Sequence, residues 1–401
     1  MSDFGTELAS LMSARGVGVR ELARAVYVNP GHVSNLRNGK TRPSPELARK
    51  LDDYLSAGGA LAARAVPQGK PPRSSRVAEA LAVAAGGEHG DTVTMDGLAD
   101  LVGHYAHVIA VAPSAAVYDE LVGARTFAST LLDRGSPGAR AELSVTAGWL
   151  SSLLAISSAD LGDHAAAVIW CADAGRRGAD AKHPELAGWA ALTRSLIAWY
   201  LGDAARSATA ASRGLSVTSK GTAAYARLAS QHMRCLAMLG DTAGMTAARR
   251  RAAEALGALA PSAGRAGVYS VVRADDPPYT ATSLLVAGQH KQAAAMTRRL
   301  IATAYPSAPG DKPTSYARTL LILALAAAGS GDADEAAAAG TAALAAGRIV
   351  WPTMVLAARL DNALTERAAG SAHAAEFRAA LADAGTRLAL TAARGAEGQD
   401  Q

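Results

Sequence analysis

Histidine and cysteine have the most versatile side-chain chemistry in this sequence, and they are few and scattered. His104 and His107 lie three positions apart in a helical pattern, a spacing that allows two imidazoles to share a metal ion. No third ligand follows at a helical spacing, so a solvated or core-edge pair is the simpler interpretation. Cys171 and Cys235 lie far apart in helical patterns, which indicates buried thiols in a reducing compartment rather than a disulfide framework.

The sequence also lacks the common catalytic motifs. It contains no phosphate-binding loop of the GxxxxGK type, no strand followed by GxGxxG, no HExxH and no paired CxxC. We therefore expect neither an enzyme nor a bound cofactor or metal.

The segment from Asn29 to Gly39 predicts a short helix with a polar face. Asn29 is a good N-cap, and Pro30 then occupies the first helical position, where no backbone donor is missed. Gly39 supplies a residue that ends the helix in the left-handed region. With Val33 and Leu36 turned inward, the outward face carries Gly31, His32, Ser34, Asn35 and Asn38.

This helix belongs to a predicted set of four within residues 4–55. The apolar residues recur at helical spacings, each helix is too short to be stable alone, and together they form one small domain. Across the whole chain, half of the residues are hydrophobic but only 4% are aromatic, and alanine dominates. Small apolar side chains suit closely packed helices, so the predicted fold class is all-α.

The stretch ELARAVYVNPGHVSNLRNGKTRPSPELARKL resembles the lambda-repressor-like helix-turn-helix of the Xre family. In that family the second helix of the motif enters the major groove of double-stranded DNA. By position, the resemblance implies base contacts from His32, Ser34 and Asn35. It implies contacts with the DNA backbone from Asn29, Asn38, Lys40 and Arg42.

Two features depart from the family pattern. Pro30 and Gly31 replace long polar side chains, which leaves Asn35 to pair with adenine and His32 to contact guanine. Tyr27 replaces the glycine that is usual in the turn. Either the turn keeps left-handed geometry at a cost of about 1 kcal/mol, or it relaxes and Tyr27 packs on the domain surface, which we expect.

Positive charge is concentrated near the N-terminus. Residues 1–76 contain 12 Lys and Arg against 6 Asp and Glu, whereas the rest of the chain is nearly neutral. Four of these cations lie in the segment Ser56–Arg76, which is rich in Gly, Pro and Ser and has no acidic residue. This segment predicts a flexible linker that either touches the phosphate backbone or is only a solvated tether.

A recurring joint marks the remainder of the chain. Glycine followed in four cases by aspartate appears at Gly162, Gly202, Gly240, Gly288 and Gly331, with intervals of 40, 38, 48 and 43 residues. Such a period predicts stacked helical hairpins that resemble tetratricopeptide repeats. The glycine ends one helix and the next residue caps the following one, with a mostly small residue five positions after the glycine.

The first helices of these hairpins line the concave face of such an array. At those positions stand Trp149, Trp189, Leu196, Trp199, Arg227, Arg234 and Arg318. The segment 261–279 interrupts the repeats and is a candidate loop over the groove. Aromatic rings beside arginines suit a peptide or an aromatic, anionic small molecule. The alternative is that the tryptophans belong to the core between repeats and that the arginines are solvated.

These observations predict four regions: a helix-turn-helix domain over 1–57, a basic linker over 58–92, a repeat domain over 93–390 and a disordered tail over 391–401. The sequence predicts a cytoplasmic, dimeric regulator of transcription that binds double-stranded DNA and senses a small molecule, a peptide or a protein partner through its repeats. The alternative is a protein-interaction scaffold with a weak or repurposed helix-turn-helix domain. No secretory signal or membrane span is expected, since no apolar run approaches about 18 residues.

Overall fold

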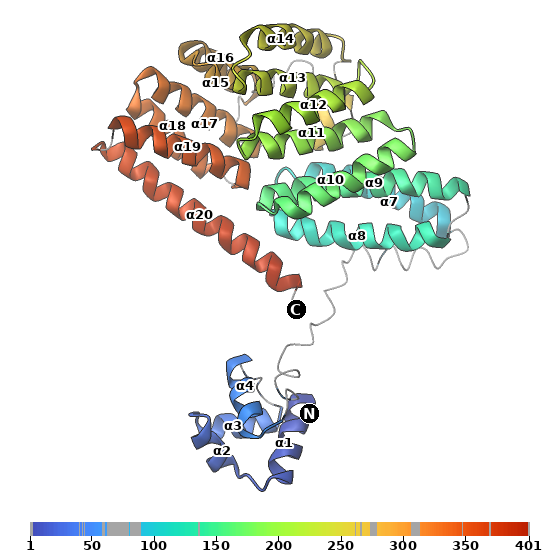
Figure 1. Cartoon of the computed structure of the whole chain (residues 1–401), viewed down its shortest axis with the longest axis vertical. Coiled ribbons are helices and arrows are strands. Elements are labelled where there is room, and N and C mark those ends of the chain that lie inside the picture. Colours follow the sequence, from blue (N-terminus) through green and yellow to red (C-terminus); the bar gives the residue numbers. More distant parts are fainter. Residues whose placement is uncertain are drawn as a thin grey trace. The chain divides into compact units, whose positions relative to one another are not determined.

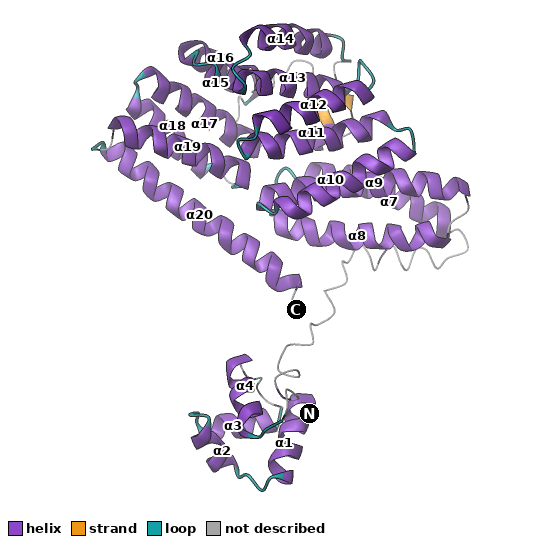
Figure 2. Ribbon diagram, viewed as in Figure 1, coloured by secondary structure: helices purple, strands orange, loops and turns teal. Residues whose placement is uncertain are grey.

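The computed structural model describes residues 3–39, 41, 43, 45–57, 61, 80, 90–134, 137–260, 262–264, 267–272, 279–305, 313–346, 348–368 and 370–399. These residues are almost entirely helical, with one pair of short strands (Figure 2). The chain divides into two compact units, one made of residues 1–74 with 396–401 and the other of residues 75–395. The predicted all-α class is confirmed.

Among its described residues, the first unit contains four full helices: α1 (Asp3–Ala14), α2 (Val19–Ala25), α3 (Pro30–Arg37) and α4 (Pro45–Tyr54). One residue from each, Leu8, Leu22, Leu36 and Leu51, is fully buried in a shared core. Leu61 also belongs to this core, and its backbone N–H donates to the carboxylate of Asp52 at 2.7 Å. The domain therefore extends beyond residue 57, because the segment assigned to the linker supplies an apolar side chain to the core.

In the described part of the second unit, α7 (Gly90–Val108) and α8 (Ser114–Arg134) come before five helical hairpins (Figure 1). These are α9 (Pro137–Leu161) with α10 (His164–Asp180), α11 (Pro184–Tyr200) with α12 (Ala204–Val217), α13 (Ala223–Met238) with α14 (Thr242–Gly257), α15 (Tyr279–Val286) with α16 (His290–Ala304), and α17 (Pro313–Ser330) with α18 (Ala333–Ala345). Two further helices, α19 (Trp351–Ala368) and α20 (Ala372–Gln399), end the array. Consecutive hairpins pack on one another, so the predicted α-solenoid is confirmed.

The joints have the predicted geometry. All five glycines have positive φ, between 73° and 90°. The four joint aspartates each accept a hydrogen bond from a backbone N–H of the following first turn, at 2.8–3.0 Å. Gln289, which follows Gly288 at the remaining joint, makes no such bond. The residues five positions after the glycines are all buried: Ala167, Ser207, Met245, Ala293 and Ala336.

One boundary differs from the sequence prediction, at the C-terminal end. Helix α20 continues to Gln399, whereas a disordered tail was expected from residue 391. The run Ala392–Ala396 contains three alanines and Arg394 around Gly395, and alanine and arginine both favour helix. The linker residues 58–60, 62–79 and 81–89 lie outside the described part of the chain.

A small insertion separates α14 from α15. Strands β1 (Ser262–Gly264) and β2 (Ser270–Val272) pair antiparallel, with Gly264 opposite Ser270, and a 3₁₀ turn, η1 (Gly267–Tyr269), lies between them. Gly267 lies so close to α7 that a Cβ there would stand 2.0 Å from the carbonyl oxygen of Ala106. The insertion is therefore packed against the start of the array.

Candidate functional sites

Helix α3 has the local structure that its sequence predicts. The side chain of Asn29 accepts a hydrogen bond from the Gly31 N–H at 2.8 Å, and Gly39 has a φ of 70°. Val33 and Leu36 are fully buried, which fixes the rotation of the helix about its axis. The exposed residues Gly31, Asn35 and Asn38 follow one another at helical spacings of four and three, so they form one polar stripe.

The other residues predicted to contact DNA differ in their exposure to solvent. His32 and Ser34 flank the stripe and are half-buried, while Asn29 is exposed at the start of the helix. Lys40 and Arg42 lie outside the described residues. Asn35 is thus the exposed side chain on α3 that can hydrogen-bond to the edge of a base.

Tyr27 corrects our expectation for the turn between α2 and α3. The residue keeps a left-handed conformation, with φ of 58°, and its side chain is 92% exposed. The turn has not relaxed, and the ring does not pack on the domain. The geometry holds because the Val28 N–H donates to the Ala23 carbonyl at 2.9 Å and so closes the C-terminal end of α2.

Gly5 positions α3 in a way that the sequence reasoning missed. A Cβ at this residue would lie 2.8 Å from the carbonyl oxygen of Leu36 and 2.9 Å from that of Arg37. Helix α1 therefore crosses the C-terminal turn of α3 at backbone contact distance. The only sequence signal was a glycine inside an otherwise regular helical pattern.

In the repeat domain, the predicted groove residues separate into two groups. Trp149 and Trp189 are 1% and 4% exposed, and both contact the ring of Tyr269 from the insertion, with centroids 4.8 and 5.2 Å apart. Tyr269 itself is fully buried. These two tryptophans therefore belong to the hydrophobic core, as the alternative interpretation of the sequence had it.

The second group gathers at the C-terminal end of α11. The guanidinium carbon of Arg234 lies 4.0 Å from the ring centroid of Trp199 and 4.7 Å from that of Tyr279. Arg359, which the sequence analysis did not select, lies 5.1 Å from the same Trp199 ring. Arg227 stands 5.9 Å from the Tyr279 ring. At these distances the arginines make cation–π contacts with the aromatic side chains.

Tyr200 links Arg318 to this group. Burial raises the pKa of Tyr200, but the positive charges of Arg318 and Arg234, together with hydrogen bonding to its hydroxyl group, outweigh burial and lower the pKa below its ordinary value. Burial, aided by repulsion from Arg234, lowers the pKa of Arg359 against the opposing influence of Tyr200. The predicted residues Trp199, Arg234 and Arg318 thus come together with Tyr200, Tyr279 and Arg359.

The comparison with protein-family models matches residues 3–65 to a helix-turn-helix domain. The N-terminal unit is a helix-turn-helix domain. This class of domain binds DNA through the helix that corresponds to α3. The match confirms the resemblance for this part of the chain and covers Leu61, which the structure places in the same core.

A solved structure of Bacillus thuringiensis PlcR, in complex with the peptide PapR7 and DNA, is also similar to this chain. The identity is 12%, the match covers 64% of this chain and 95% of that one, and the TM-score is 0.27. A likeness at this level does not define the ligand or the assembly of this chain. The comparison with curated proteins finds no relative.

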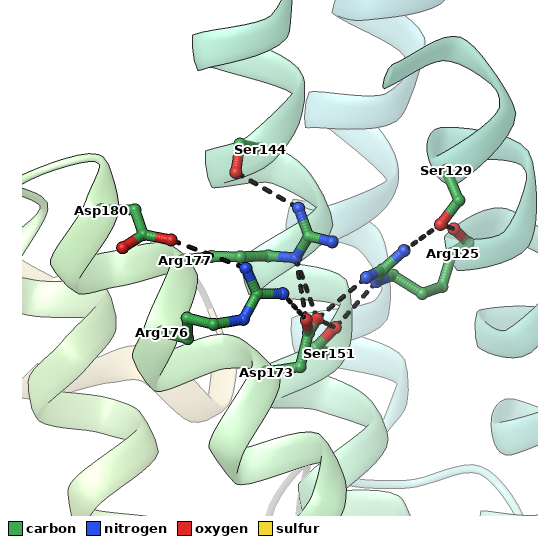
Figure 3. A network of polar contacts seen from close by, with 8 residues as sticks. All are labelled: Arg125, Ser129, Ser144, Ser151, Asp173, Arg176, Arg177 and Asp180. Carbon is green, nitrogen blue, oxygen red and sulfur yellow. Dashed lines mark hydrogen bonds and ion pairs between the residues drawn. The ribbon is translucent and has the colours of Figure 1, made fainter. Parts of the chain in front are cut away.

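Outside the helix-turn-helix domain, a polar network joins α8, α9 and α10 (Figure 3). Asp173 accepts hydrogen bonds from Arg125 at 2.9 Å, Ser151 at 2.7 Å and Arg177 at 2.9 Å. Burial raises the pKa of Asp173, but these bonds and the charge of Arg125 prevail and hold the pKa well below its ordinary value. Because these side chains bond to one another across three helices, the network has a structural role in holding the helices together.

Both cysteines lie inside the core of the repeat domain. Cys171 and Cys235 are free and buried, and burial raises the pKa of Cys171 to about 12. The Cys235 sulfur lies 3.0 Å from the Ser207 hydroxyl inside the core. Among the described residues, no three His, Cys, Asp or Glu side chains are grouped so as to hold a metal ion. The helices described here include none long and apolar enough to cross a membrane.

Proposed function

We propose that this protein is a sequence-specific, DNA-binding regulator of transcription whose reading helix is α3. The observation that carries the proposal is the exposed polar stripe on a helix that is capped by Asn29 and anchored by Val33 and Leu36. Uncharged amide groups suit base edges, which present both donors and acceptors in the major groove. The positive charge of residues 1–76 supplies the attraction to phosphate.

Asn35 is the main base-reading residue in this proposal. Its amide can pair bidentately with adenine, which discriminates against a wrong base by about 1–3 kcal/mol. His32 and Ser34 add contacts at the edges of the stripe, while Asn29, Asn38, Lys40 and Arg42 hold phosphates. With two of the first helical positions occupied by Pro30 and Gly31, the protein also depends on DNA shape and on the spacing of half-sites.

We also propose a homodimer. One domain of this size contacts too few base pairs for strong specificity, and half-sites in this class repeat about one helical turn, roughly 34 Å, apart. The dimer surface is assigned to the repeat domain. Light scattering on the full chain, with and without operator DNA, is expected to give twice the monomer mass, and a strict monomer under both conditions would exclude this assembly.

The repeat domain is proposed to sense an effector. Its stacked hairpins gather Trp199, Arg234 and Arg318 from three different helices, an arrangement that can recognise a peptide or a small molecule and shift when it binds. Trp149 and Trp189 have no part in this site, since Tyr269 covers both.

A gel-shift and footprint experiment on the DNA upstream of the protein's own gene tests the proposal. Asn35→Ala is expected to lower affinity and relax preference at one base position. Lys40→Ala is expected to weaken binding to all sequences. It is also expected to reduce the slope of log affinity against log salt concentration by about one. Asn362→Ala, an exposed asparagine of α19, is the matched control and leaves binding unchanged. If neither Asn35→Ala nor Lys40→Ala weakens binding at moderate salt, α3 is not the reading helix.

One alternative has support in the structure. Pro30 and Gly31 offer no base-reading side chain, and an exposed Tyr27 beside them resembles a protein contact more than a phosphate contact. This favours an interaction scaffold whose helix-turn-helix domain is repurposed. Genome-wide mapping of bound DNA separates the two, because a scaffold enriches no sequence motif.

A further inference from the structure

Three arginines from three helices converge on one pair of aromatic residues in the repeat domain. Arg234 belongs to α13, Arg318 to α17 and Arg359 to α19. Trp199 and Tyr200, at the end of α11, lie among them. Residues so far apart in sequence meet here only because the repeat array curves, so the cluster is a property of the folded domain.

The cluster has an excess of positive charge. Within the described part of the chain, no Asp or Glu forms an ion pair with Arg234, Arg318 or Arg359. The carboxylate whose charge acts on Arg318 is Asp160, and it is already paired with Arg348 at 2.7 Å. Natural proteins rarely bury charges without a partner, because desolvation of each ion costs several kcal/mol.

Arg234 is the most buried of the three arginines, and its hydrogen bonding is incomplete. The residue is 5% exposed, and one of its terminal nitrogens donates to the Gln231 side chain at 2.6 Å. Its buried Nε has no hydrogen-bond partner among the described residues. A buried N–H of a cation that lacks an acceptor costs more than a neutral one, so an acceptor, preferably an anionic one, is missing here.

We propose that this cluster binds the carboxylate or phosphate group of a small-molecule effector. Arginine presents paired N–H groups that match both of these anions, and such bonds are stronger than neutral ones. Cation–π contacts with Trp199 and Tyr279 hold the Arg234 guanidinium in place, so little side-chain entropy is lost when the anion arrives. Arg318, Arg359 and Tyr279 are half-buried, which leaves the cluster a side open to solvent.

This inference deepens the proposed sensing role. It rests on the proposed function only in treating the bound anion as an effector. Anion binding itself is independent of DNA. A cluster built for a ligand is also expected to cost stability when the ligand is absent, since like charges repel in a buried setting. A cluster that serves only the fold would contribute stability through its cation–π contacts.

The test measures binding and thermal stability of the full chain. Benzoate and inorganic phosphate are titrated separately by calorimetry at constant ionic strength, with chloride as the reference anion, so that the two arms distinguish a carboxylate from a phosphate. We expect one of them to bind and to raise the melting temperature. Arg234→Met and Arg318→Met are each expected to weaken that binding about tenfold, the loss for one charge-assisted hydrogen bond. Arg298→Met, which removes an exposed arginine paired with Glu335, is the matched control and changes nothing.

Stability of the ligand-free variants gives the second readout. Arg234→Met is expected to raise the melting temperature of the ligand-free protein. A lower melting temperature for this variant, together with no binding of either anion to the wild type, would overturn the proposal. Loss of DNA binding in Asn35→Ala alongside absent anion binding would refute this inference alone and leave the proposed regulator intact.

Discussion

The guanidinium group of Arg348 lies 2.7 Å from the carboxylate of Asp160, across 188 residues of sequence. The same side chain donates to the Ala112 carbonyl at 2.9 Å and to the Ser114 hydroxyl at 2.6 Å. Arg348 precedes α19, whereas its partners stand at α8 and α9. Nearby, the ring of Trp351 contacts that of His164 at 4.0 Å between centroids. The late hairpins are therefore tied to the early ones, and the array closes on itself.

Replacing Arg348 with methionine is expected to loosen this closure. Both partners are largely buried, with side chains 8% and 14% exposed. The change therefore leaves the Asp160 carboxylate stranded, that is, buried without its positively charged partner. Removal of one partner from a buried ion pair costs about 3–5 kcal/mol. Urea unfolding of the full chain measures the loss as a lower midpoint.

Two further variants make this prediction specific. Arg378→Met breaks an exposed pair with Asp361 and is expected to cost less than about 1 kcal/mol. Adding Asp160→Asn to Arg348→Met is expected to restore part of the stability, because no stranded charge remains. Equal midpoints for Arg348→Met and Arg378→Met would show that the closure contributes little.

The Asp173 network predicts a dependence of stability on pH (Figure 3). The folded protein lowers the pKa of this carboxyl, so the folded state binds fewer protons than the unfolded state in acid. The stabilisation is complete above the ordinary carboxyl pKa of about 4 and is lost as the pH falls through the lower folded value. Thermal melts between neutral pH and acid are expected to show a steeper fall for the wild type than for Asp173→Asn, which has no charge to lose. Parallel curves would contradict the role of this network.

Gly5→Ala is expected to destabilise the helix-turn-helix domain and weaken DNA binding. The added Cβ would lie within 3 Å of two carbonyl oxygens of α3, so α1 has to move away from the reading helix. Overpacking of this kind typically costs about 1–3 kcal/mol. Gly103→Ala is the matched control, since a Cβ in that helix meets nothing within 4 Å. The prediction fails if the two alanine variants have the same DNA affinity and the same melting temperature.

Much of the fold could be predicted from sequence because its signals are local. Asn29 and Gly39 bracket α3, and the joint at Gly162 and Asp163 ends one helix and caps the next, all through contacts within a few residues. Such contacts depend on residue type and spacing, which a sequence displays directly.

The sites were predicted only in part because they depend on distant contacts. The sequence placed Trp149 and Trp189 on the concave face, but it could not show that Tyr269, 80 residues beyond Trp189, would cover them. Arg359 was missed because it lies beyond the last joint, in a helix that returns to α11 only when the array curves. Gly5 and Leu61 were missed because their importance comes from backbone approach and core packing across helices.

Tyr27 gives the last prediction, because its conformation is unfavourable and its side chain has no compensating contact with the domain. A residue with a Cβ in the left-handed region costs about 1–2 kcal/mol, whereas glycine adopts it freely. Tyr27→Gly relieves this strain, although glycine's greater freedom in the unfolded chain offsets part of the gain, so we expect a net stabilisation of up to about 1 kcal/mol. Tyr27→Ala keeps the strain and removes only the ring, so its melting temperature is expected to stay at the wild-type value. If both variants also keep wild-type DNA affinity, the exposed ring has no part in DNA binding. If both lose it equally, Tyr27 is a DNA contact, and the strain is retained for that contact.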